Sequence, residues 1–221
     1  MSAHSNYSII FDMDGVLVDS EPVIEAAAIR GLAEYGIKAV SEDFKPFIGA
    51  GEDRYIGGVA EKYGVPYQLE MKSRVYEIYL TLVKENLHVY DGTLELLSKL
   101  EEEDVSIALA SSADVIKVKA NLKVAAIPFE TFKTVITGED VVHKKPSPEI
   151  FLKAAEGLKV HPSRCIVVED AVNGIHAAKA AGMKCVAIAS TFSKELLQTE
   201  KPDCVVDSIK EVYWALKSIG I

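Results

Sequence analysis

The sequence predicts a doubly wound α/β fold, in which a mainly parallel, Rossmann-like sheet is interrupted by an inserted all-helical segment. Three observations lead to this fold class: continuous apolar runs, helical stretches between them, and one long segment without a strand. Continuous apolar runs are typical of strands that are buried on both faces of a parallel sheet. Their alternation with helical stretches predicts helices packed on both faces of that sheet.

Short apolar runs define the expected strands, and a weaker run adds a sixth. The strands are expected at 7–11, 105–110, 134–136, 165–168, 184–189 and, more weakly, 203–206. Helices are expected at 94–103, 114–125, 148–157, 171–181 and 209–218. Ligands of such sheets bind beyond the carboxyl ends of the strands, so the residues at these ends are the first candidates for function.

The segment from residue 22 to about residue 86 contains no convincing strand. Its apolar residues recur at helical spacing, and Ser20 with Pro22 makes a plausible helix start. We therefore expect residues 1–20 and 87–221 to form the α/β domain, and residues 21–86 to form a helical domain inserted after the first strand.

Composition excludes several classes of protein. The chain has 221 residues, of which 49% are hydrophobic and 26% charged, which is typical of a globular protein. Its net charge of −9, without a Lys/Arg cluster, argues against binding to nucleic acid or to an anionic membrane. The stretch MSAHSNYS lacks the features of a signal peptide, and no apolar run approaches the roughly 18–20 residues that span a bilayer. We therefore expect a cytoplasmic protein.

Two acids stand two positions apart where the first predicted strand ends, in the stretch FDMDGVLVDS. Burying Asp12 and Asp14 side by side is costly unless a partner compensates their charge. Asp170, which follows Glu169, stands at the end of the fourth predicted strand and so reaches the same rim of the sheet. Carboxylate oxygens are the ligands that magnesium prefers, and a cation between Asp12 and Asp170 would relieve the repulsion. The sequence therefore predicts a magnesium site at this rim.

A hydroxyl group and a lysine are expected at the same rim. Ser111 ends the second predicted strand in IALASS, and Lys145 lies in HKKPSP. A hydroxyl donor and a point positive charge suit a phosphoryl group, and Gly15 lets the backbone turn its amides inward. Together with the paired acids, this set is typical of phosphoryl transfer through a carboxylate nucleophile. Asp12 is positioned to attack, and Asp14 to move the proton.

These residues stand in four motifs that resemble those of the haloacid dehalogenase (HAD) superfamily, in the branch of β-phosphoglucomutase-like phosphatases. FDMDGVLVDSEP resembles the first motif, LASS the second, KKPSPEIF the third and VVEDAVNGIHAAKAAGM the fourth, in order and along essentially the whole chain. Two further stretches, GAGEDRYIGGVA and SSADVIKVKANL, are similar to the HAD domain of plant suppressor-of-quenching proteins. The resemblance implies an α/β core and a helical cap inserted after the first motif.

The resemblance also implies a role for each motif residue. Asp12 would be the nucleophile and Asp14 the general acid/base. Magnesium would be held by Asp12, the backbone carbonyl of Asp14 and Asp170, with Glu169 acting through a water molecule. The phosphate-binding residues would be Ser111, Ser112 and Lys145.

Substrate choice is expected to lie mainly with the cap. The candidates are Glu21, Gly49, Glu52 and Arg54 from the insertion, and His143, Lys144 and Asn173 from the sheet side. A structural alternative is open for several of them. Arg54 is also consistent with a solvated helix position, His143 with a polar loop, and Asn173 with a hydrogen bond to the start of its own helix.

Two departures from the family pattern favour hydrolysis over mutase chemistry. Many members of this branch carry a His in the first cap helix, where this chain has Ile24. The mutases hold a second phosphate with a cap Arg, where this chain has Glu52, and Arg54 follows two residues later. An acid in place of the cation weakens the binding of a bisphosphate.

The sequence therefore predicts a magnesium-dependent phosphatase that acts on a small phosphorylated metabolite, such as a sugar phosphate. A sugar phosphomutase is the alternative if Arg54 reaches the position of the family's Arg. A binding module that has lost catalysis is a further alternative, against which the intact acid pair argues.

Overall fold

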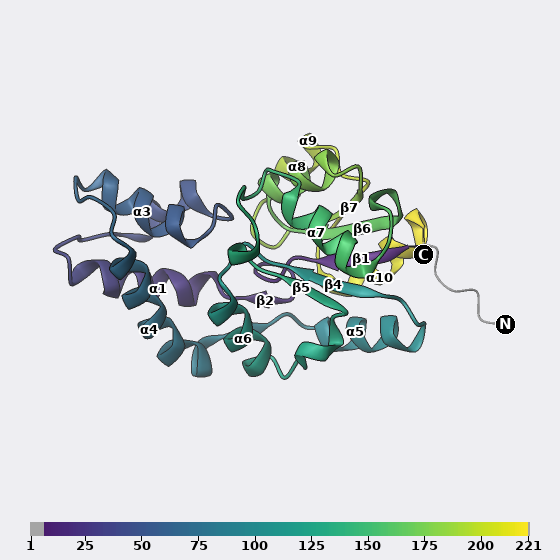
Figure 1. Ribbon diagram of the computed structural model, residues 1–221, viewed down its shortest axis with the longest axis horizontal. Helices are drawn as coiled ribbons and strands as arrows, with labels where there is room; N and C mark the ends of the chain where they lie inside the picture. The colour runs from purple at the N-terminus through teal and green to yellow at the C-terminus, as the bar shows by residue number, and fades with distance from the viewer. Residues whose placement is uncertain (1–6, 221) are drawn as a thin grey trace.

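A six-stranded parallel sheet forms the centre of the structure, a computed structural model that describes residues 7–220 (Figure 1). Its strand order is β5-β4-β1-β6-β7-β8, and every neighbouring pair is parallel. The strands are β1 (Ser8–Phe11), β4 (Ile107–Ala110), β5 (Thr134–Ile136), β6 (Cys165–Glu169), β7 (Lys184–Ile188) and β8 (Cys204–Val206). This sheet confirms the predicted fold class, and it puts β1 at the centre, where the chain order of the strands reverses.

Helices cover both faces of the sheet because successive side chains of a strand point to opposite sides. Ile9 and Phe11 of β1 pack with α5 (Thr93–Glu102), α6 (Val115–Val124) and α10 (Ile209–Ile219). Ile10 packs on the other face with α7 (Glu149–Leu158), α8 (Val172–Ala180) and α9 (Lys194–Thr199). Short 3-10 turns complete the domain at Phe129–Thr131, Gly138–Asp140 and Pro162–Arg164. The buried, apolar strands thus have the double cover that continuous apolar runs predict.

Residues 21–86, the predicted insertion, contain only helices and loops and lie to one side of the sheet (Figure 1). The helices are α1 (Glu21–Ala33), α2 (Ser41–Phe44), α3 (Glu52–Lys62) and α4 (Leu69–Asn86), with a 3-10 turn at Lys45–Phe47. They enclose an apolar core of their own, in which α1 packs along α4. Gly31 allows this close approach, since a Cβ atom there would lie 2.7 Å from the side chain of Val75.

A two-stranded antiparallel ribbon joins the cap to the sheet domain. It consists of β2 (Val18–Asp19) and β3 (His88–Val89), with Val18 opposite Val89. These strands cannot be predicted from the sequence, because two residues are too short to show a periodic pattern. The ribbon holds the two crossings of the chain together beside the carboxyl end of β1, and so sets where the cap meets the sheet.

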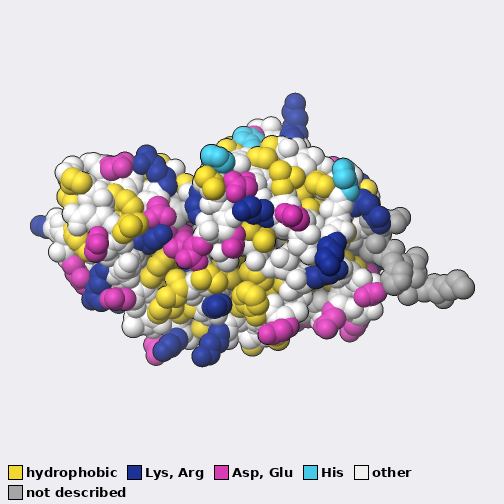
Figure 2. All heavy atoms as spheres, viewed as in Figure 1, with side chains coloured by type: hydrophobic (Ala, Val, Ile, Leu, Met, Phe, Trp, Pro, Cys, Tyr) yellow, Lys and Arg dark blue, Asp and Glu magenta, His cyan; other side chains and the backbone are white. Residues whose placement is uncertain are grey.

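Within residues 7–220, none of the helices combines the length and the apolarity that crossing a bilayer requires. On the face shown in Figure 2, Lys and Arg side chains are scattered among Asp and Glu side chains and form no single basic patch.

Candidate active site

Asp12, Lys145 and Glu169 meet at the carboxyl ends of β1 and β6. The backbone N–H of Asp12 donates to the carbonyl of Val168 at 2.9 Å, which continues the pairing of the two strands by one residue. The Nζ atom of Lys145 donates to Asp12 Oδ1 at 2.6 Å and to Glu169 Oε1 at 2.5 Å. All three side chains are buried. The contact between Asp12 and Lys145 therefore joins two residues that are 133 positions apart in the chain.

Three carboxylates at this rim form a set that fits a divalent cation. Asp12, Glu169 and Asp170 each offer an oxygen atom, and these atoms all lie within 4.8 Å of one another. Burial raises the pKa of Asp12 to about 7, with Lys145 opposing the shift and Glu169 adding to it. Burial likewise raises the pKa of Asp170 well above its usual value, with Glu169 and Asp12 adding to it. One lysine cannot balance three buried carboxylates, and oxygen ligands of this kind suit magnesium.

Gly15 makes the turn that brings the first motif against Asp170. Its φ is +78°, and its N–H donates to the carbonyl of Val18 at 2.8 Å. A Cβ atom at Gly15 would lie 2.0 Å from Oδ2 of Asp170. The position therefore requires glycine both for its left-handed backbone and for the space that the carboxylate occupies.

We expect Gly15→Ala to weaken magnesium binding by more than tenfold, because the new methyl group displaces Asp170. Gly36→Ala is the matched control: Gly36 has φ +77° and no atom within 4 Å of a Cβ. Both variants lose about 1 kcal/mol of stability from the left-handed backbone alone. Calorimetric titration with magnesium separates the two effects. Equal magnesium affinity in both variants would contradict the assignment of Asp170 to the metal site.

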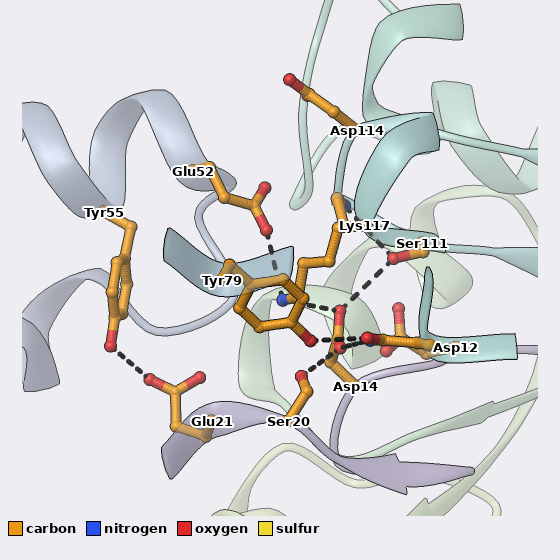
Figure 3. A network of polar contacts seen from close by, with 12 residues as sticks. Asp12, Asp14, Ser20, Glu21, Glu52, Tyr55, Tyr79, Ser111, Asp114 and Lys117 are labelled. Atoms are coloured by element: carbon orange, nitrogen blue, oxygen red, sulfur yellow. Dashed lines mark hydrogen bonds and ion pairs between the residues drawn. The ribbon is translucent and has the colours of Figure 1, made fainter. Parts of the chain in front are cut away.

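Asp14 accepts hydrogen bonds from several elements at once (Figure 3). The hydroxyl of Ser20 donates to Oδ1. The Asn121 amide also donates to Oδ1, at 3.3 Å, and the Ser111 hydroxyl lies 3.5 Å from Oδ2. The ammonium of Lys117 lies 3.3 Å from Oδ2. The carboxylate is thus held in one orientation by donors from the residue after β2, from the end of β4 and from α6.

The cap contributes side chains to the same network. Lys117, only 4% exposed, also pairs with Oε1 of Glu52 from α3 at 3.2 Å. The hydroxyl of Tyr79 from α4 donates to Asn121 at 2.5 Å. Burial opposes the charge of Lys117, but Asp14 and Glu52 outweigh it and raise the pKa of the ammonium group. Cap and sheet domain therefore meet through a buried, charged contact next to Asp14 (Figure 3).

Most of the predicted site residues line one cavity between the cap and the sheet. They are Asp12, Asp14, Glu21, Gly49, Glu52, Ser112, Lys145, Glu169 and Asp170. Ser111 is fully buried, and its hydroxyl oxygen accepts a hydrogen bond from the backbone N–H of Ala113 at 3.2 Å. The cavity wall also includes Ile24 of α1.

Arg54, His143 and Asn173 are absent from the cavity wall in the described part of the chain. Arg54 is more than half exposed and pairs with Glu61 at 2.8 Å, with its guanidinium over the ring of Phe47. His143 is exposed, and its backbone N–H donates to Glu149 at 2.9 Å. Lys144, half-buried, bonds the carbonyl of Gly138. The positions of Arg54 and His143 fit the structural alternatives better than a role in substrate binding.

Four further residues of this network were not predicted from the sequence: Lys117, Asn121, Tyr55 and Tyr79. Lys117 and Asn121 are four residues apart in α6, so they share a helix face, and a polar pair on a face that packs inward is a signal that could have found them. Tyr55 of α3 donates its hydroxyl to Glu21 at 2.7 Å, and both residues line the cavity. Contacts of this kind depend on how the cap packs on the sheet domain, which no local pattern records.

Residues 9–188 match the sequence model of the family described as haloacid dehalogenase-like hydrolase. The chain belongs to this family. It is 39% identical over 210 residues to Protein SUPPRESSOR OF QUENCHING 1, chloroplastic, of Arabidopsis thaliana, a match that covers 93% of this chain but only 20% of that protein. It is 32% identical over 227 residues to a phosphorylated carbohydrates phosphatase of Thermotoga maritima, covering 93% and 99% of the two chains.

The solved structures point to the same branch of the HAD-like hydrolases. β-Phosphoglucomutase from Clostridium difficile superposes with a TM-score of 0.84 at 26% identity, over 96% of this chain and 95% of that one. These matches confirm the predicted membership of the HAD superfamily and of its β-phosphoglucomutase-like branch.

Proposed function

We propose that the protein is a magnesium-dependent phosphatase, which hydrolyses a small phosphorylated metabolite through an aspartyl phosphate on Asp12. The single observation that carries this proposal is the buried contact of Asp12 with Lys145 beside Asp170 and Glu169. A nucleophilic carboxylate needs neighbouring cations both to stay ionised and to accept a phosphoryl group. The similarity to a phosphorylated carbohydrates phosphatase supports the same reaction.

The reaction would run in two displacement steps. In the first, an oxygen of Asp12 forms a bond to phosphorus, the bond to the leaving oxygen breaks, and Asp14 gives that oxygen a proton. In the second, Asp14 takes a proton from water, whose oxygen attacks phosphorus and releases inorganic phosphate and free Asp12. Lys145, Ser111 and Ser112 would hold the phosphoryl oxygens throughout.

Magnesium, when bound, would screen the charge between the phosphoryl oxygens and the nucleophile. Asp12, Asp170 and the backbone carbonyl of Asp14 would hold it, with Glu169 acting through a water molecule. The excess of buried carboxylates at this rim supports that ligand set.

We expect magnesium to raise the melting temperature of the protein, because it binds the folded site and relieves the repulsion among its carboxylates. At a concentration of 100 times Kd the gain is about 2.7 kcal/mol. Thermal denaturation with magnesium and with EDTA measures the shift, and Asp170→Asn should lose most of it. If the magnesium and EDTA buffers gave the same melting temperature and the same rate of phosphate release, the proposed magnesium site would be contradicted.

Glu52 supports hydrolysis over mutase chemistry. Its carboxylate lines the cavity where the resemblance leads us to expect a phosphate-binding Arg, while Arg54 pairs with Glu61 on the surface. The similarity to β-phosphoglucomutase keeps the mutase as a second candidate. Incubation with β-glucose 1-phosphate and a trace of its bisphosphate distinguishes the two: we expect inorganic phosphate, whereas substantial glucose 6-phosphate would favour the mutase.

A further inference from the structure

The ion pair of Glu52 and Lys117 stands on the leaving-group side of the candidate active site. Lys117 contacts Asp14 at 3.3 Å and Glu52 at 3.2 Å, so only the lysine separates the cap carboxylate from the proposed proton donor. Both side chains line the cavity, and both are more than nine-tenths buried. A group of the substrate only a few bonds from the leaving oxygen can therefore reach Glu52.

One oxygen of this carboxylate has no partner. Oε1 of Glu52 is paired with Lys117, whereas Oε2 is buried and, among residues 7–220, accepts no hydrogen bond from the protein. A buried carboxylate oxygen without a donor is costly, and native structures normally satisfy such atoms. Glu52 is one of the residues that line the cavity, so a substrate bound there can supply the donor that the protein itself does not.

We propose that Glu52 and Lys117 select a substrate whose leaving group carries an uncharged hydroxyl group near the phosphoryl oxygen, and that they reject a leaving group with a second anion. The inference rests on the proposed phosphatase function and specifies its substrate class. Glu52 accepts a hydrogen bond from that hydroxyl through Oε2, while Lys117 holds the carboxylate in place through Oε1. Glu52 is thus a specificity-determining residue, and Lys117 positions it.

The charges around Lys117 decide against the two alternative leaving groups. Lys117 is already compensated by Asp14 and Glu52, so a second phosphate or a carboxylate finds no free cation there and meets the negative charge of Glu52. An ammonium group of a substrate that bound to Oε2 would lie close to the buried ammonium group of Lys117 and be repelled by it. A hydroxyl group supplies the missing donor without adding charge.

A pair of three-carbon substrates tests the selection directly. Glycerol 3-phosphate and 3-phosphoglycerate differ only in a terminal hydroxymethyl or carboxylate group, and we compare their kcat/KM values as a ratio. We expect the wild type to favour glycerol phosphate by about 30-fold or more, and Glu52→Gln to reduce this ratio at least fivefold. A ratio is independent of the fraction of enzyme that is folded.

Glu61→Gln is the control, since Glu61 lies on the same helix with its side chain largely exposed and pairs with Arg54. It should leave the ratio unchanged. A wild-type ratio near one, or equal ratios in wild type and Glu52→Gln, overturns the proposal. So does a tenfold preference for the analogue with a terminal amino group in place of the hydroxyl. p-Nitrophenyl phosphate tests the phosphatase function separately: no hydrolysis of any ester overturns both inferences, whereas hydrolysis without discrimination overturns only the selection.

Discussion

Asp12→Asn is expected to abolish turnover, with a fall in kcat on the order of 10⁴-fold or more. The amide is a poor nucleophile, and no other carboxylate can replace it at the end of β1. The variant should still fold, because Lys145 keeps its ion pair with Glu169 at 2.5 Å. Magnesium-dependent release of p-nitrophenol measures the loss, and circular dichroism checks the fold.

Asp91→Asn is the matched control for this substitution. Asp91 is a largely exposed residue whose nearest cationic partner is Lys210 at 3.5 Å, so the same chemical change should leave kcat unaltered. Activity that survives in purified Asp12→Asn above one part in a hundred would rule out Asp12 as the nucleophile.

Asp14→Asn is expected to lower kcat by about 10²–10⁴-fold, because proton transfer is lost in both displacement steps. The two steps should respond differently with p-nitrophenyl phosphate, since nitrophenolate leaves without a proton whereas the attacking water must lose one. We therefore expect a rapid release of one nitrophenol per enzyme, followed by slow turnover. Stopped-flow absorbance records both phases.

The burst separates a role in proton transfer from a role in folding or in metal binding. A variant that had lost its magnesium site would show neither the burst nor the slow phase, and calorimetric titration measures its magnesium affinity independently. A uniform slowing without a burst, at unchanged magnesium affinity, would assign Asp14 a different role. Asp91→Asn again provides the control.

The sheet could be predicted from the sequence because its strands are buried on both faces. A continuous apolar run such as residues 165–168 has few other structures open to it between two helices. The two-stranded ribbon of β2 and β3 could not be predicted in the same way. Its pairing of Val18 with Val89 is set by where the cap and the sheet domain meet, which is a property of the tertiary structure.

The candidate site likewise contains some residues that could be predicted from the sequence and others that could not. Asp12, Asp14, Glu169 and Asp170 lie at or just beyond the carboxyl ends of β1 and β6, so a parallel sheet brings them to one rim. The resemblance to a known family supplied their roles, and the geometry agrees with the expected proximity. Lys117 could not be found in this way, because it lies within a helix and its role depends on an ion pair with Glu52 of the cap, 65 positions earlier in the chain.

The covalent state of Asp12 during turnover tests the central claim most directly. Asp14→Asn is mixed with p-nitrophenyl phosphate and magnesium, quenched in acid during the slow phase and reduced with borohydride, and the peptide that contains residues 11–20 is examined by mass spectrometry. We expect Asp12, and no other residue, to be converted to homoserine in nearly stoichiometric yield. Nitrophenol release with an unmodified Asp12, or modification of another residue, would contradict it.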